Sequence, residues 1–122
     1  MLRVVLVWPL VNIVKLSGSD LFKRVFSSGQ SIQNKSFRVF YFGNNEEYSR
    51  FGLVVPKRVA KLAHDRNYMK RVCRDLIRMH KTNTLFFDVV FIARKPFFSG
   101  EYHNVVQEFR DIINKIPCFD KL

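Results

Sequence analysis

Lysine and arginine recur along residues 57–81 at spacings that would place many of them on one side of a helix. Lys70, Arg74 and Arg78 follow one another at intervals of four residues, and Arg66 precedes Lys70 by four. A helix turns about 100° per residue, so each such step advances only about 40° around its axis. Guanidinium and ammonium groups in such a row can bind successive phosphate oxygens. This spacing therefore indicates binding to a nucleic acid backbone.

The same segment has an apolar side that could hold the row in place. On the helical wheel Arg71 and Lys81 fall in the charged sector, and Asn67, which can reach a base edge or a ribose hydroxyl, lies among them. The residues of the opposite sector are Met69, Val72, Cys73, Leu76 and Met79. We therefore expect a helix over about residues 66–81, with Asp65 as its N-cap, that packs its apolar side on a sheet.

The charge of this region is unusual for a surface that merely faces water. From Pro56 to Lys81 there are nine basic and two acidic residues, a net charge of +7 out of +11 for the chain. Like charges four residues apart repel by a few tenths of a kcal/mol, so a merely solvated helix would interleave glutamate. The excess indicates a polyanionic partner. An anionic membrane is the weaker alternative, because the apolar side lacks residues suited to insertion and is needed for the core.

Residues for protein-based catalysis are not grouped in the sequence. Asp65 and Asp75 are ten residues apart on different sides of the expected helix, and Asp88 stands alone in an apolar segment. A nuclease with its own active site needs clustered carboxylates or a histidine pair. Cys73 and Cys118 show no metal-binding spacing, and we expect them to be reduced thiols. We therefore predict no catalytic residue and no metal site in the protein.

The remaining elements must position the basic helix. We predict a helix over 19–28 capped by Ser19 or Asp20, strands over 36–42, 50–55 and 86–93, and a last helix over about 100–115. Turn residues 43–47 and Pro56 bound the first two strands. The order α-β-β-α-β-α, with room for a further N-terminal strand, predicts an α+β or mixed sandwich. At 122 residues the chain is expected to form one domain, 1–122.

The first fourteen residues form an atypical apolar arm. They read MLRVVLVWPLVNIV, which is too short an apolar stretch to span a bilayer and is followed by no cleavage site. A signal peptide is the alternative to a strand, a packing arm or a misassigned start. We expect a cytoplasmic protein that is not bound to a membrane.

Several blocks of the chain resemble the bacterial ribonuclease P protein subunit. The family signature, Arg-Asn-Arg followed by Lys-Arg and a further Arg, is matched by RNYMKRVCR at 66–74, with Tyr68 in place of the third arginine. The blocks DLFKRVFSSG, GLVVPKRVAKLAHDRN and FFDVVFIARKPF are similar to other parts of the family and occur in the same order. The likeness covers about residues 15–115 and defines an expected core over 15–116; it does not include the arm.

The resemblance implies a fold and an activity. The fold is an α/β sandwich of the ribosomal protein S5 domain 2-like type, α-β-β-β-α-β-α, with a central mixed sheet and a left-handed βαβ crossover through the basic helix. General connection rules favour the right hand instead. The activity is endonucleolytic removal of the 5′ leader from precursor tRNA, leaving a 5′-phosphate. Catalysis is expected from the RNA subunit, which holds Mg²⁺, with no cofactor bound tightly by the protein.

The implied partners are the RNA subunit and the precursor tRNA leader, with one protein monomer per RNA. The residues expected to bind the RNA subunit are Lys57, Arg58, Lys61, Arg66, Asn67, Lys70, Arg71, Arg74 and Arg78, and Lys81 would extend this set. Those expected to bind the leader, in a cleft between the first helix and the sheet, are Phe22, Phe26, Arg38 and Phe40. With thirteen phenylalanines in the chain, each of these rings has a place in the core as its alternative. Two other functions stay open: a non-enzymatic RNA-binding module, such as a ribosomal protein or RNA chaperone, and a ribonuclease that acts alone.

Overall fold

The computed structural model describes residues 16, 18–80, 85–97 and 99–119. Its elements are α1 (Ser19–Ser28), β1 (Gln30–Gln33), β2 (Phe37–Gly43), β3 (Arg50–Val54), α2 (Ala63–Met79), β4 (Phe87–Ala93), a 3₁₀ turn (Ser99–Glu101) and α3 (Tyr102–Ile113). The expected α-β-β-β-α-β-α order is confirmed. The apolar arm, Lys81 and the break at 82–84 lie outside the described residues.

The four strands form a mixed sheet in the order β1-β2-β4-β3. Strand β2 pairs antiparallel with β1 and with β4, whereas β3 and β4 are parallel. Helix α2 connects the two parallel strands, so the basic helix is the crossover of a βαβ unit. The left hand of this crossover stays a prediction.

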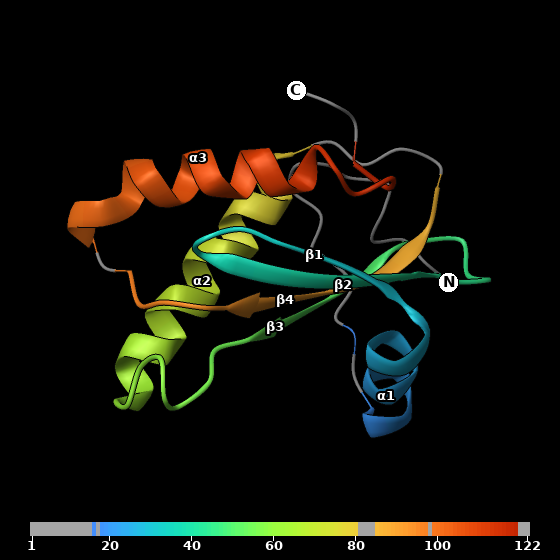
Figure 1. Cartoon of the computed structure of the whole chain (residues 1–122), viewed down its shortest axis with the longest axis horizontal. Helices are drawn as coiled ribbons and strands as arrows, with labels where there is room; N and C mark the ends of the chain where they lie inside the picture. The colour runs from blue at the N-terminus through green and yellow to red at the C-terminus, as the bar shows by residue number, and fades with distance from the viewer. Residues whose placement is uncertain (1–15, 17, 81–84, 98, 120–122) are drawn as a thin grey trace.

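The sheet has helices on both faces, with α1 and α3 on opposite sides (Figure 1). Strand β2 alternates between the two faces, as the pleat requires. Its residues Phe37 and Val39 join Met69 of α2 and Phe109 of α3 in the larger core. On the other face, Val90 of β4 packs with Val25 of α1. The helices therefore pack their apolar residues against the sheet, as their amphipathic sequences predict.

Strand β1 was not predicted from residue patterns. Its sequence, Gln-Ser-Ile-Gln, has a single apolar residue, and all but Ile32 are exposed. An edge strand has a partner on one side only and needs little burial, so it lacks the apolar signal that reveals a central strand. The backbone pairing with β2, from Gln30 opposite Tyr41 to Gln33 opposite Arg38, defines it.

The expected helix caps were wrong. Helix α2 begins at Ala63 and has Leu62 as its N-cap, with no side-chain cap bond. Asp65 therefore lies in the first turn, where its negative charge favours the positive end of the helix. Helix α1 is capped by Gly18, whose φ of 95° is a conformation that suits glycine. Ser19, expected as a cap, is the first residue of that helix.

Candidate nucleic-acid interface

The buried side of α2 is wider than the wheel indicated. Met69, Val72, Cys73 and Leu76 are buried as expected, and Ile77 is buried with them. Ile77 falls only about 20° from Arg66 on the wheel, so the core extends beneath the charged sector. The placement of Met79 in the core was wrong, because its side chain is 63% exposed near the end of the helix. Helix α2 thus packs one side in the core and presents an outer strip to solvent.

That outer strip carries a cationic ridge, which we define as Lys70, Arg71, Arg74 and Arg78. Arg71 is exposed and the other three are half-buried. Long basic side chains in such positions lie along the protein surface with their stems while the charged ends reach water. Asn67 is exposed on the same side of the helix. The structure therefore brings together the residues that the signature block predicted.

The four cations of the ridge differ in their partners. Arg78 is 3.2 Å from the carboxylate of Asp75. The guanidinium of Arg71 lies 5.6 Å from the ring centre of Tyr68, the residue that replaces the third arginine of the signature. In the described part of the chain, the side chains of Lys70 and Arg74 have neither a hydrogen bond nor an ion pair. These two charges are available to an external anion.

The connector, which we define as residues 55–62 between β3 and α2, carries three further cations. Lys57, Arg58 and Lys61 are exposed. Their chain is folded by a turn in which the amides of Val59 and Ala60 donate to the carbonyl of Pro56, at 2.9 and 3.2 Å. The three charges therefore project from an ordered loop next to the start of α2.

Arg66, the first residue of the signature, is engaged by the connector. Its Nη1 donates to the carbonyl oxygens of Ala60 and Lys61, at distances of 3.1 and 2.8 Å. The side chain is half-buried in this position. Arg66 thus differs from Lys70 and Arg74, although all three lie in the charged sector.

Phe22 packs closely on the sheet. A Cβ atom on Gly52 of β3 would lie 2.8 Å from the Cζ atom of Phe22, so this ring needs a glycine beneath it. Phe22 borders the core cluster that contains Val25 and Val90. Phe22 is half-buried there and is therefore less open than an exposed ring would be.

Phe26, Arg38 and Phe40 form a more exposed group, which we call the aromatic platform. The rings of Phe26 and Phe40 meet edge to face at 5.1 Å, and Phe26 is 42% exposed. The guanidinium of Arg38 lies 4.9 Å from the ring centre of Phe40. The platform therefore combines open aromatic surface with a positive charge.

The register of the sheet relates the platform to the connector. Arg38 is paired with Ile92 of β4, and Ile92 is paired with Val54, the last residue of β3. The connector begins at the next residue, so Arg38 lies at the end of the sheet from which the connector leaves. Arg38 of the platform and the cations of the connector thus border the same end of the sheet.

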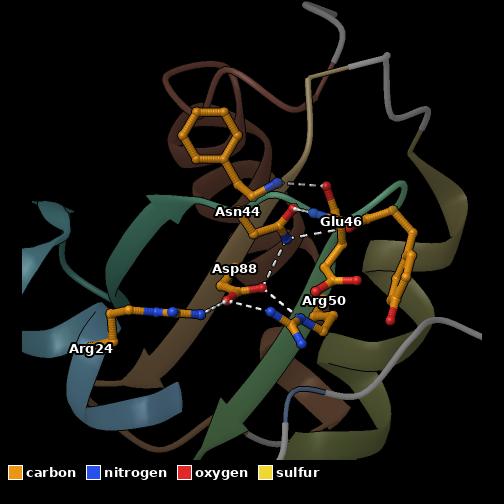
Figure 2. A network of polar contacts seen from close by, with 8 residues as sticks. Arg24, Asn44, Glu46, Arg50 and Asp88 are labelled. Atoms are coloured by element: carbon orange, nitrogen blue, oxygen red, sulfur yellow. Dashed lines mark hydrogen bonds and ion pairs between the residues drawn. The ribbon is translucent and has the colours of Figure 1, made fainter. Parts of the chain in front are cut away.

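A buried carboxylate joins α1 to the sheet at its other end, and Figure 2 shows Arg24 and Arg50 directed at it. Asp88 is 0% exposed, and both of its oxygens accept hydrogen bonds from Arg50, at 2.8 and 2.9 Å. Asn44 donates to it at 2.9 Å, and Arg24 of α1 lies 3.8 Å away. The hydrogen bond to Asp88 raises the pKa of Arg50.

Asp88, which stands alone in its apolar segment of the sequence, has an arginine partner in the fold. Its partner Arg50 is directly opposite on the adjacent parallel strand, and this pairing becomes visible only when the register is known. Because Arg24 belongs to the helix that carries Phe26, the network helps to hold the aromatic platform against the sheet.

The thiols of the chain are buried. Burial raises the pKa of the Cys73 thiol and of the Cys118 thiol to about 12. A protonated thiol is a poor nucleophile and a poor metal ligand. In the ranges that the structure describes, no three His, Cys, Asp or Glu residues gather as a metal site, and no helix there could cross a membrane.

The remaining carboxylates near the ridge also have partners. Asp65 lies 3.1 Å from His64, and Asp75 is paired with Arg78. Together with Asp88, they lie on separate parts of the fold and do not form a common acid–base site. The arrangement can bind anions and unstacked bases.

Comparison with known proteins agrees with this geometry. The Ribonuclease P family model matches residues 10–117. The chain is 32% identical to the ribonuclease P protein component of Thermoanaerobacter sp. (strain X514), over 88% of this chain and 93% of that protein. It is 31% identical to the RNase P protein from Thermotoga maritima, over 84% of this chain and 96% of that structure, with a TM-score of 0.71. The Staphylococcus aureus RNase P protein, at 24% identity and a TM-score of 0.76, shares the fold over 87% of this chain and 97% of that one. The chain belongs to the family of bacterial ribonuclease P protein components.

Proposed function

We propose that this chain binds the RNA subunit of ribonuclease P and the 5′ leader of precursor tRNA, and so assists removal of the leader. Membership of the family implies an RNA subunit as partner and a role in tRNA processing. The observation that carries the finer assignment is the pair of cations Lys70 and Arg74, which have no hydrogen bond or ion pair with any described residue, on the helix that follows the exposed cations of the connector. Phosphates of the RNA subunit would replace the missing carboxylates.

The aromatic platform supplies a surface for the leader. Phe26 and Phe40 can stack on unpaired bases of any sequence, which suits an enzyme that processes many precursors. Arg38 can bind a phosphate of the same strand. Because the platform and the connector border one end of the sheet, a leader on the platform would lie near RNA bound to the connector.

Hydrolysis of the phosphodiester bond is assigned to the RNA subunit. The acids near the cationic surfaces, Asp65, Asp75 and Asp88, are each paired with a basic side chain, which supports this assignment. Mg²⁺ would be held mainly by the RNA, and the protein cations would lower the repulsion between the RNA subunit and its substrate. One monomer per RNA, in the cytoplasm, is part of the proposal.

Reconstitution tests the proposal against its alternatives. The purified protein is mixed with ribonuclease P RNA at low magnesium, and precursor tRNA is added. Leader removal that requires both components is the expected result. Cleavage by the protein alone would indicate an independent ribonuclease, and a lack of stimulation would indicate another kind of RNA-binding module.

A further inference from the structure

Arg66 is held differently from the cations that follow it along α2. Its Nη1 bonds to two successive carbonyl oxygens, those of Ala60 and Lys61. Lys70 and Arg74, one and two turns further along, have no such bonds to the described residues. A guanidinium that donates to two carbonyls has satisfied part of its hydrogen-bonding capacity before any RNA is present.

The two carbonyls belong to the connector, which also carries the exposed cations Lys57, Arg58 and Lys61. No side chain caps the start of α2, since its N-cap is Leu62. Within the described ranges, the Arg66 bonds are the side-chain hydrogen bonds that tie the connector to α2. The connector is also held by the burial of Val55 and Ala60 and by the carbonyl of Leu62, which accepts from two amides of α2. The Arg66 bonds add a side-chain tie next to Lys61, and the position of the connector cations depends in part on them.

We infer that Arg66 is a positioning residue, which holds the connector so that its three cations are aligned with Lys70 and Arg74 for binding to RNA. This inference rests on the proposed function. Arg66 then contributes to RNA affinity through other cations and not through a phosphate contact of its own. An ordered connector has already lost the conformational entropy that binding would otherwise remove, so its loosening weakens binding at every contact that it carries.

Hydrogen exchange on the free, full-length protein tests the structural part. The variants are Arg66→Gln and, as a matched control, Arg74→Gln, which removes the same charge from the same helix. In R66Q the amides of Val59 and Ala60 are expected to exchange several-fold faster, while the exchange rates of the β4 amides stay unchanged. In R74Q the exchange rates of Val59 and Ala60 should not change. Unchanged exchange in the connector would overturn the inference. If R66Q also accelerates β4, Arg66→Met, which keeps the aliphatic stem, replaces it.

A double-mutant cycle on binding to ribonuclease P RNA tests the functional part. The loss of RNA affinity caused by R66Q is measured in two backgrounds. One is the wild type, and the other is a triple variant without the connector charges, Lys57→Gln, Arg58→Gln and Lys61→Gln. We expect a large fold-loss of affinity in the first background and a much smaller one in the second. One phosphate contact contributes about 1 to the slope of log affinity against log salt concentration. In the wild-type background, R66Q should make this slope less steep by more than that amount.

The outcomes separate this inference from the proposed function. R66Q could lower the RNA affinity equally in both backgrounds and change the slope of log affinity against log salt concentration by about 1. This result would show that Arg66 binds a phosphate itself and would overturn its positioning role. R74Q should give equal losses in both backgrounds. Failure of the wild type to bind the RNA would overturn the proposed function, and the exchange experiment would then decide the role of Arg66 in the connector by itself.

Discussion

Arg50 and Asp88 form a two-point ion pair in the interior of the sheet, with Nε to Oδ1 at 2.8 Å and Nη2 to Oδ2 at 2.9 Å. The two residues are directly opposite on the parallel strands β3 and β4. The carboxylate is fully buried and the arginine side chain is only 13% exposed. Breaking such a pair leaves a charge in the interior without its counterion.

Asp88→Asn is therefore expected to destabilise the fold by about 3–5 kcal/mol. The amide keeps the size of the side chain but removes the carboxylate that makes both hydrogen bonds with Arg50. Urea unfolding followed by circular dichroism measures the change. Arg24→Gln is the control, because Arg24 lies 3.8 Å from the same carboxylate and is 49% exposed, and such pairs contribute about 0–1 kcal/mol. Equal unfolding midpoints for D88N and the wild type would contradict a stabilising role for the network.

The double variant Lys70→Gln/Arg74→Gln should make binding to ribonuclease P RNA less sensitive to salt. The slope of log affinity against log salt concentration should become less steep by about 2. Both charges lack intramolecular partners among the described residues, so their removal should leave folding intact. The control is Arg110→Gln/Lys115→Gln, which removes the same net charge from exposed positions in and after α3. An equal change of slope in both pairs would mean that only the total charge matters.

Phe26→Ala is expected to weaken binding of precursor tRNA to the holoenzyme by about 1–3 kcal/mol, the contribution of one base–aromatic stack. Mature tRNA has no leader, so its affinity should not change. Tyr102→Ala on α3 is a matched control, because Tyr102 is 40% exposed and Phe26 is 42% exposed. If F26A weakened the binding of both tRNAs equally, Phe26 would be a folding residue and not a leader contact.

The buried thiols predict a loss of stability in alkali. The pKa of the Cys73 thiol is raised from 9.0 to about 12 in the folded state, so the folded protein keeps a proton that the unfolded chain releases. The free energy of unfolding should therefore fall as the pH rises from about 9 to about 12, by up to about 1.4 kcal/mol per pH unit for each thiol.

Urea unfolding of the wild type and of Cys73→Ala between about pH 8 and about pH 11 measures this slope. The alanine variant should start from a lower stability, because it leaves a small cavity, but should lose less as the pH rises. Parallel curves for the two proteins would show that the Cys73 thiol does not contribute to the pH dependence.

The sequence predicted elements with strong periodicity better than their ends. The basic helix and strand β2 were found because their apolar residues repeat about every 3.6 and 2 residues, and β4 was found as a continuous apolar run, which matches its burial along nearly its whole length. The start of α2 at Ala63 was missed because Asp65 has the character of a cap but is used in the first turn. Met79 fits the apolar period yet lies near the end of the helix, where the core no longer covers it.

The sequence predicted which residues belong to the candidate site. It did not predict the hydrogen bonds and ion pairs that these residues make. The charged sector revealed which cations share a side of α2, since this follows from helix geometry alone. That Arg66 bonds to the connector, and that Asp88 bonds to Arg50, depends on tertiary placement. Spacing along the chain does not contain this information. The same holds for Phe22 of α1, whose close packing depends on Gly52 of strand β3.

Strand β4, the last of the strands in the part of the chain that the structure describes, lies between β2 and β3 and pairs with both. A nascent chain that ends before residue 87 therefore has the β1–β2 hairpin but no strand against which β3 can align. Its basic helix would be synthesised before the sheet that supports it can close. The sheet should thus close only after β4 has been synthesised, and fragments that lack β4 should not fold.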